Sequence, residues 1–338
     1  MAPLPSYGTK VAVAVRMAPD IRVQTMGMGK IGIAFGGGAA RGWAHIGVLR
    51  GLLQAGIVPD IIAGTSIGAV VGGCFAAGRL DELEGFARDL TRRKVFGYLD
   101  FNLTGSGLIT GQRVVERLEG HLAGIDLENV QPRFVAVATE IGTGQEIWVS
   151  RGSLVQAMRA SYAIPGIFRP VNIEGRWLFD GALVNPVPVS VCRALGARYV
   201  IAINLNSDLC GRGSVLPDPS LAPEAQPASV ARTEEPRPGA RKLLQRQLFG
   251  GGDSGPGFST VMLDAFNIVQ DRIARSRLAG DPPDAIINPQ LAGIGLFDFH
   301  RADELIGRGL AAAQREIDDL KREIHARRVV SNGMSMHN

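Results

Sequence analysis

Two strand–turn–helix units near the start of the chain limit the fold more than any other feature. In the first, alternating apolar residues over 31–35 predict a buried strand, which three glycines end before a helix-like stretch that reaches Gln54. In the second, a short strand over 61–63 leads into a tight turn over 64–68 and a helix of small residues over 69–77. Successive units of this kind place their strands parallel in one sheet with helices on its faces, so we expect an α/β fold.

The rest of the chain is expected to extend this pattern. Further helices are predicted over 80–93, 111–122, 154–162, 260–278 and 301–328. Further strands are predicted over 133–140, 146–149, 199–204 and 285–288, with a hairpin approach over 166–178. No internal repeat of fixed period appears.

Composition shifts divide the chain into five parts. Residues 1–29 show no sustained period and are expected to be a flexible extension, and 30–206 are expected to form the main folded core. Residues 207–258 are dense in Pro, Gly, Ser and charge, which is typical of a disordered insert. The core is expected to resume over 259–328 with a long terminal helix, and 329–338 are expected to be a flexible tail.

Charge and composition exclude some classes of partner. The net charge of +4 weakly favours anionic surfaces such as phospholipid headgroups. Aromatic residues are only 6% of the chain, and no basic run is interleaved with stacking residues, so nucleic acid is not an expected partner. The three cysteines are odd in number and far apart, which fits neither a disulfide framework nor a metal site. Because no apolar run reaches membrane-spanning length, we expect a cytoplasmic protein with at most peripheral contact with the inner membrane surface.

The turn after the second strand carries a candidate nucleophile. Ser66 is flanked by Gly64 and Gly68 in a Gly-x-Ser-x-Gly pattern, in which the glycines permit a strained turn that lifts the serine Oγ above the sheet edge. The pattern also occurs by chance in structural turns. Here the predicted strand ends at Ala63 and a predicted helix follows the turn, which is the context that a nucleophile elbow requires.

The glycine run after the first strand is a candidate oxyanion hole. Gly36, Gly37, Gly38 and Ala39 lie at a predicted helix start, where backbone N–H groups and the helix dipole favour negative charge. The alternative is a nucleotide phosphate loop, but Arg41 stands where a dinucleotide loop has its third glycine. Arg41 itself is expected either to support the loop, to attract a phosphate or to form a salt bridge at the helix start.

A serine nucleophile needs a base, and Asp180 is the best candidate. The five histidines lie at positions that favour solvated or helix-capping roles, namely His45, His121, His300, His325 and His337. A carboxylate can replace an imidazole when it is held close to the serine in a partly desolvated site. Asp180 follows an apolar strand-like segment and precedes Gly181, although an Asp-Gly pair is more often only a turn.

Taken together, these motifs resemble the patatin-like phospholipase family, in particular its bacterial members related to neuropathy target esterase. The resemblance spans nearly all of 30–326 and includes matching segments over 160–166, 185–188 and 270–277. It implies a three-layer α/β/α fold with a mainly parallel central sheet and a Ser66–Asp180 dyad without histidine. It further implies an oxyanion hole from Gly37, Gly38 and Ala39, and hydrolysis of phospholipid or lysophospholipid acyl esters without metal or cofactor. One departure is Ala182, since many members have glycine after Asp-Gly.

Two other functions stay open at this point. An acyltransferase acting on a thiol carrier would have a related fold, but such proteins have histidine before the nucleophile, where this chain has Thr65. A non-catalytic lipid-binding regulator is the second alternative, and the intact Ser66 and Asp180 argue against it. The oligomeric state is not predicted by the sequence.

Two amphipathic segments are candidates for surface contacts. Residues 241–249 combine apolar and basic side chains and would suit an interfacial helix on an anionic membrane. In the C-terminal helix an apolar stripe repeats at spacings of four and three, which predicts docking on the core rather than self-association. The stripe consists of Ile306, Leu310, Ala313, Ile317, Leu320 and Ile324.

Overall fold

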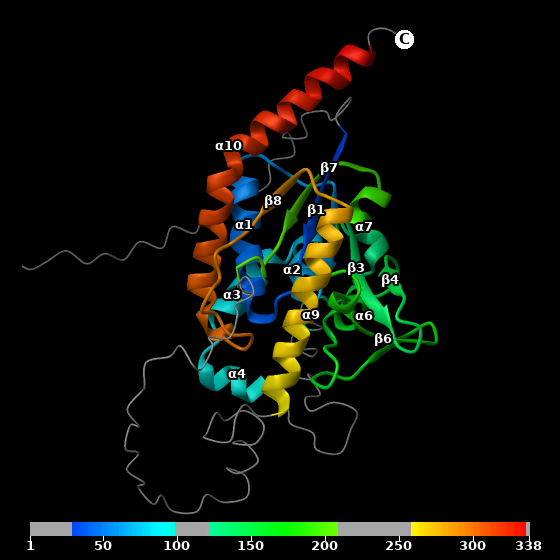
Figure 1. The fold of residues 1–338 in the computed structure, drawn as a ribbon, viewed down its shortest axis with the longest axis vertical. Coiled ribbons are helices and arrows are strands. Elements are labelled where there is room, and N and C mark those ends of the chain that lie inside the picture. Colours follow the sequence, from blue (N-terminus) through cyan, green and yellow to red (C-terminus); the bar gives the residue numbers. More distant parts are fainter. Residues whose placement is uncertain (1–28, 99–119, 121, 209–257, 336–338) are drawn as a thin grey trace, which may run out of the picture.

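A single eight-stranded sheet lies at the centre of the protein, with helices on both faces (Figure 1). The structure is a computed structural model that describes residues 29–98, 120, 122–208 and 258–335. The strands are β1 (Lys30–Phe35), β2 (Ile61–Thr65), β3 (Arg133–Glu140), β4 (Glu146–Val149), β5 (Val171–Ile173), β6 (Arg176–Asp180), β7 (Ala197–Ile203) and β8 (Ala285–Ile287). Their order is β5-β6-β3-β2-β1-β7-β8, with β4 paired to β3.

Helices and short 3₁₀ turns connect the strands and cover both faces of the sheet. The α-helices are α1 (Trp43–Gln54), α2 (Ile67–Ala76), α3 (Leu80–Arg88), α4 (Arg92–Tyr98), α6 (Leu154–Tyr162), α7 (Val189–Ala194), α9 (Phe258–Gly280) and α10 (Ala302–Ser335). The 3₁₀ turns are η1 (Ala39–Gly42), η2 (Leu127–Asn129), η3 (Gly181–Leu183) and η5 (Phe299–Arg301). Pairing is parallel from β3 through β2, β1 and β7 to β8, and antiparallel for β4, β5 and β6. The expected mainly parallel α/β/α fold is confirmed.

Alternate residues of each central strand enter two separate hydrophobic cores. In β1, Ile31, Ile33 and Phe35 pack into the larger core with α1, α2, α3, α6 and α10, whereas Ala34 packs into the smaller one with α7 and α9. The same alternation holds in β3, where Phe134 and Val135 face opposite sides. Because side chains alternate across a strand and both faces of a parallel sheet are covered, both sets are buried.

Two strands meet end to end along β3, and this arrangement creates the site. β2 pairs parallel with β3 as far as Thr65 opposite Val137, and β6 pairs antiparallel with β3 from Asp180 opposite Ala138. β4 occupies the other edge of β3, since it pairs with residues that also pair with β2 and with β6. The carboxyl ends of β2 and β6 therefore point toward each other at neighbouring positions.

The structure corrects several predicted element boundaries. The single helix expected over 80–93 is two helices, α3 and α4, and helix α7 was not predicted. The last helix continues to Ser335, so its predicted end at Arg328 is wrong, whereas the flexibility expected from residue 329 onward stays a prediction. Residues 1–28, most of 111–122, nearly all of the 207–258 insert and the 241–249 segment lie outside the described residues.

The apolar stripe of α10 docks on the core as predicted. Ile306, Ala313, Leu320 and Ile324 are buried, and α10 packs along α1 (Figure 1).

Candidate active site

Ser66 stands in a strained turn between β2 and α2. Its backbone dihedrals are φ 57° and ψ −126°, a region that a non-glycine residue rarely adopts. Gly64 and Gly68 are needed because neighbouring backbone leaves no room for side chains there. A Cβ on Gly64 would stand 2.6 Å from Ala69 Cα, and one on Gly68 would overlap Phe35 O. The turn therefore has the geometry of a nucleophile elbow.

The side chains of Ser66 and Asp180 are in direct contact. Ser66 Oγ donates to Asp180 Oδ2 at 2.6 Å, and both residues are buried, with 4% and 0% of their surface exposed. The other carboxylate oxygen, Oδ1, accepts from Ala182 N at 2.8 Å. Gly181 is required between them, since a Cβ there would overlap Val137 O. Both oxygens of the carboxylate are thus held in fixed positions.

Burial shifts the pKa of the Asp180 carboxyl upward. Desolvation raises this pKa from 3.8 to about 7, against the opposing hydrogen bonds from Ser66 and Ala182. A carboxyl group with a pKa near neutrality can both take up and release a proton at physiological pH.

Ser161 holds the elbow in place from α6. Its hydroxyl accepts the backbone N–H of Ser66 at 2.9 Å and donates to Val137 O at 2.6 Å. Thr65 adds a second anchor by donating its hydroxyl to Asn185 O at 2.8 Å. Thr139 similarly donates to Asp180 O at 2.9 Å. These buried hydrogen bonds connect the two catalytic candidates to the same central strands.

The glycine loop lies against the elbow, but its amides are not equally available. The N–H groups of Gly36 and Gly37 donate to Ile203 O at 3.1 Å and to Pro186 O at 3.0 Å. The N–H of Gly37 therefore already has a partner in this structure, and the oxyanion role of Gly37, Gly38 and Ala39 stays a prediction. Within the described residues, no acceptor contacts the amides of Gly38 and Ala39, and Ala39 has a positive φ of 49°.

Arg41 and His45 stabilise the glycine loop through hydrogen bonds that reach its carbonyl groups. Arg41 Nη1 donates to Asn206 Oδ1 at 2.8 Å, and Asn206 Nδ2 donates to Gly37 O at 3.3 Å. His45 Nε2 lies 2.7 Å from Gly36 O and donates to it, and burial lowers the pKa of the imidazole to about 4. In the described part of the chain, no histidine hydrogen-bonds to Ser66 or Asp180.

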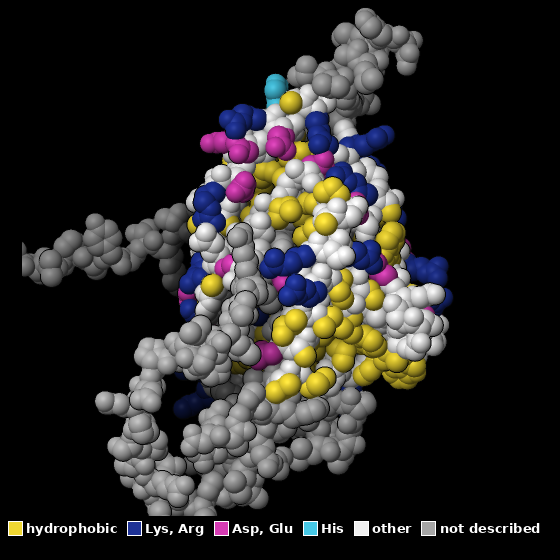
Figure 2. Space-filling view, in the orientation of Figure 1, with side chains coloured by type: hydrophobic (Ala, Val, Ile, Leu, Met, Phe, Trp, Pro, Cys, Tyr) yellow, Lys and Arg dark blue, Asp and Glu magenta, His cyan; other side chains and the backbone are white. Residues whose placement is uncertain are grey.

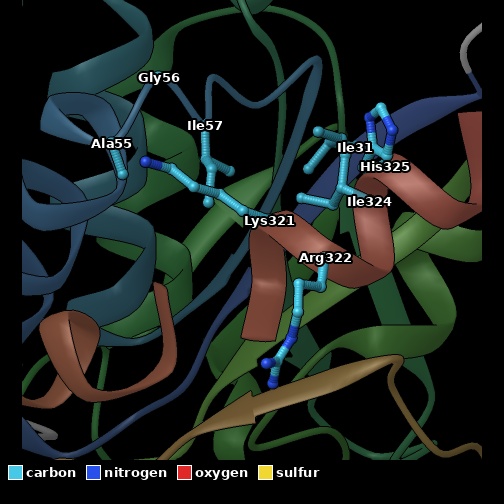
Figure 3. Close-up of a pocket in the computed structure, with 8 residues that line it drawn as sticks. All are labelled: Ile31, Ala55, Gly56, Ile57, Lys321, Arg322, Ile324 and His325. Atoms are coloured by element: carbon cyan, nitrogen blue, oxygen red, sulfur yellow. The ribbon is translucent and has the colours of Figure 1, made fainter. Parts of the chain in front are cut away.

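The pocket shown in Figure 3 is separate from the dyad. Its volume is about 460 Å³, and it lies between α10 and the loop that follows α1, with Lys321, Arg322 and His325 at its rim. Ile31 at the amino end of β1 lines it, whereas Ser66 follows the carboxyl end of β2. Over 29–98, 122–208 and 258–335, no group of three or more His, Cys, Asp or Glu side chains is placed to hold a metal ion. Nor is any described helix both long and apolar enough to span a bilayer.

Sequence reasoning assigned no role to several residues that surround the dyad. Ser161, Asn185 and Gln270 lie within segments that matched the family resemblance, which is the signal that marks them. Asn206 and Thr139 carry no such signal, because only the tertiary structure brings them to the site.

Comparison with known proteins identifies the family. A model described as patatin-like phospholipase matches residues 33–193. An uncharacterized NTE family protein of Mycobacterium tuberculosis is 32% identical, with 88% of this chain and 96% of that protein covered. A second such protein from the same species is 31% identical over 84% of this chain and 46% of its own length. A lysophospholipase of Emericella nidulans is 31% identical over 52% of this chain and 12% of its own length. The chain belongs to the NTE-related group of the patatin-like phospholipases.

Proposed function

We propose that this lipid ester hydrolase cleaves fatty-acyl esters of phospholipids or lysophospholipids through a Ser66–Asp180 dyad. The observation that carries the proposal is the 2.6 Å hydrogen bond from Ser66 Oγ to a buried carboxylate at a strained elbow. A nucleophile in contact with a positioned base is the geometric requirement for covalent acyl transfer.

In the first half of the proposed reaction, Ser66 attacks the ester carbonyl carbon. Its hydroxyl proton passes to Asp180 Oδ2, and the carbonyl oxygen becomes a tetrahedral oxyanion. The amides of Gly38 and Ala39, which no acceptor contacts in the described part of the chain, are the proposed donors to this oxyanion, in place of the amide of Gly37. The intermediate collapses when the leaving alkoxide takes the proton from Asp180, so that an acyl-Ser66 ester and an alcohol remain.

In the second half, water hydrolyses the acyl-enzyme. Asp180 takes a proton from water as the water oxygen bonds to the acyl carbon, and Ser66 Oγ regains that proton when the ester bond breaks. The pKa of about 7 supports this exchange, because the carboxyl must act as base and acid in alternate steps.

Transfer to a thiol carrier is disfavoured by the residue before the nucleophile. Thr65 is buried, and its hydroxyl is used in the bond to Asn185 O. It therefore offers no second base near Ser66 for an acceptor thiol. Product analysis with a thiol and with water as acceptors separates the two reactions.

An apolar surface beside the site supports a lipid substrate. The first half of α9 exposes Val261, Met262, Ile268 and Val269, each between 42% and 53% accessible. Figure 2 shows hydrophobic side chains over this part of α9, with basic side chains above them. The opposite face of the helix carries Gln270, which lies close to Gly37 and Ala182. We propose that this face of α9 contacts the lipid aggregate from which substrate enters the site.

The test of the dyad uses Ser66→Ala and Asp180→Asn. Each variant is expected to reduce hydrolysis of acyl esters by at least about 10³-fold, because the two residues act as a unit. The measurements are turnover of a soluble short-chain ester and labelling by a fluorophosphonate probe, which reacts with activated serines. Ser66→Ala should abolish labelling at this position.

Matched substitutions on the surface serve as controls. Ser150→Ala and Asp318→Asn change the same residue types at exposed positions, and both should retain wild-type turnover. Near wild-type turnover in either dyad variant, with the fold intact by circular dichroism, would contradict the assignment.

A further inference from the structure

Gln270 places an unsatisfied hydrogen-bond acceptor beside the dyad. The residue lies on α9 with 3% of its surface exposed, and its buried Oε1 has no hydrogen-bond partner in the part of the chain that the structure describes. Buried polar atoms almost always have partners, so an acceptor left without one indicates a ligand or a water that completes it.

Gln270 Oε1 lies beside the glycine loop and the nucleophile. An ideal Cβ built on Gly37 would stand 3.3 Å from Gln270 Oε1, 3.4 Å from Ala182 Cβ and 3.5 Å from Ser66 Cβ. All three groups therefore lie around the same position next to Gly37, where even a methyl group would fit only tightly. The carboxamide oxygen of Gln270 and the side chain of Ser66 border this position.

Other polar side chains around the dyad already have partners. The hydroxyls of Thr65, Ser161 and Thr139 all donate to backbone carbonyls, and Asn206 bonds to Arg41 and to the loop. Among these side chains, Gln270 is the one whose buried oxygen has no hydrogen-bond partner within the described residues.

We propose that Gln270 is a positioning residue that orients the water in deacylation, a role that rests on the function proposed above. Water has two O–H groups. One gives its proton to Asp180 as the water oxygen bonds to the acyl carbon, after which the bond to Ser66 Oγ breaks and Oγ takes that proton back. The other O–H donates to Gln270 Oε1 throughout, so the attacking lone pair is directed at the acyl carbon.

The same position receives the leaving alcohol during acylation. In acylation an alcohol oxygen leaves the carbonyl carbon, and in deacylation a water oxygen attacks it. The two oxygens therefore occupy equivalent positions. An ester oxygen has no O–H to donate, so Gln270 contributes little to acylation. The loss of its acceptor is therefore expected to slow deacylation selectively.

Pre-steady-state hydrolysis of a fatty-acyl p-nitrophenyl ester by the full chain separates the two steps. The burst of p-nitrophenolate reports acylation, and the later linear phase together with the mass of the acyl-enzyme reports deacylation. Gln270→Met keeps the length of the side chain but removes the acceptor. We expect deacylation at least about tenfold slower, accumulation of acyl-Ser66, and an acylation rate within about twofold of wild type.

Two further variants separate orientation of water from packing of α9. Gln270→Glu keeps an acceptor oxygen at the same length and should restore deacylation when it is measured on the pH plateau. Asn267→Leu, one turn earlier on α9, removes a carboxamide whose buried Oδ1 also has no partner among the described residues, and it should deacylate like wild type. If Gln270→Met were unstable, Gln270→Ala would be compared in the same way.

The outcomes test the role of Gln270 separately from the proposed Ser66–Asp180 hydrolysis. Equal slowing of both steps in Gln270→Met, unchanged deacylation, or the same defect in Asn267→Leu would each overturn the role of Gln270 and leave the dyad in place. Wild-type protein that turns over without any acyl adduct on Ser66 would overturn both proposals.

Discussion

The buried carboxyl of Asp180 predicts the pH dependence of activity. A base must be deprotonated to accept the Ser66 proton, and the pKa of this carboxyl is raised by burial to about 7. We expect log kcat/KM on a soluble ester to rise by about one per pH unit below pH 7 and to level off above it. An acid limb centred near pH 4 would show that the working base is a solvated carboxyl, which contradicts the assignment.

The pKa values of His45 and Asp180 also predict opposing effects on stability. The imidazole pKa falls from 6.5 to about 4 on folding, so stability from this group is present above pH 6.5 and is lost as the pH falls toward 4. The carboxyl pKa rises from 3.8 to about 7, so stability from this group is present below pH 3.8 and is lost as the pH rises toward 7. Between about pH 4 and 6.5, the gain in stability with pH from His45 and the loss of stability with pH from Asp180 cancel.

Asp180→Asn removes the contribution of the Asp180 carboxyl to the pH dependence of stability. Relative to wild type, the free energy of unfolding of this variant should increase with pH from 4 to 6.5, by roughly 3 kcal/mol in total. His45→Gln, which can still donate to Gly36 O, should show a relative decrease over the same range. Urea unfolding of the three proteins at several pH values measures the differences. Parallel pH profiles would contradict the two pKa shifts.

The sequence indicates the reactive residues but not which groups around them are free. The Gly-x-Ser-x-Gly pattern and the Asp-Gly pair are local signals, and the structure brings Ser66 within hydrogen-bond distance of Asp180. The amide of Gly37 is engaged by Pro186 O, from a segment about 150 residues later in the chain. Such a contact depends on tertiary packing, so a local pattern cannot predict it.

At the scale of elements, the close packing of α1 and α10 depends on glycine. A Cβ on Gly309 would overlap Ala44 O, and one on Gly47 would overlap Ile306 O. We expect Gly309→Ala to lower the free energy of unfolding by about 1–3 kcal/mol, because the helices must move apart. Thermal or urea unfolding measures this change.

Gly307 provides a control two residues earlier on the same helix. It is exposed, and a Cβ there meets nothing within 4 Å. Gly307→Ala should therefore raise stability by about 0.5–1 kcal/mol through helix propensity alone. Equal effects of the two substitutions would contradict the packing argument.

The spacing of apolar residues predicts that these helices exist better than it predicts where they end. The stripe from Ile306 to Ile324 correctly indicated the face of α10 that docks. The helix end at Ser335 was missed, because the apolar stripe stops at Ile324 and the helix runs on past Asn332 and Gly333, which would usually end it. The break between α3 and α4 was also missed, because Asp89 and Leu90 fit the helical period although the chain turns there.

For the whole molecule, the parallel half of the sheet follows from the sequence and the antiparallel half does not. The strand–turn–helix units at 31–54 and 61–77 require parallel neighbours, and β1 and β2 pair in that way. The position of β6 against β3, end to end with β2, depends on pairing between residues about 40 positions apart. No local signal specifies that pairing, although it brings Asp180 to the nucleophile.

The exposed apolar face of α9 predicts a difference between aggregated and soluble substrates. The double variant Ile268→Glu, Val269→Glu places charge where contact with lipid is proposed, so hydrolysis of phospholipid vesicles should fall at least about fivefold. Turnover of a soluble short-chain ester should stay within about twofold, since neither residue belongs to the dyad or the glycine loop. Val58→Glu is the matched control, because Val58 is 52% exposed but precedes the amino end of β2, whereas Ser66 follows its carboxyl end. Equal activity of all three proteins on vesicles, with equal co-sedimentation, would show that lipid does not meet this face of α9.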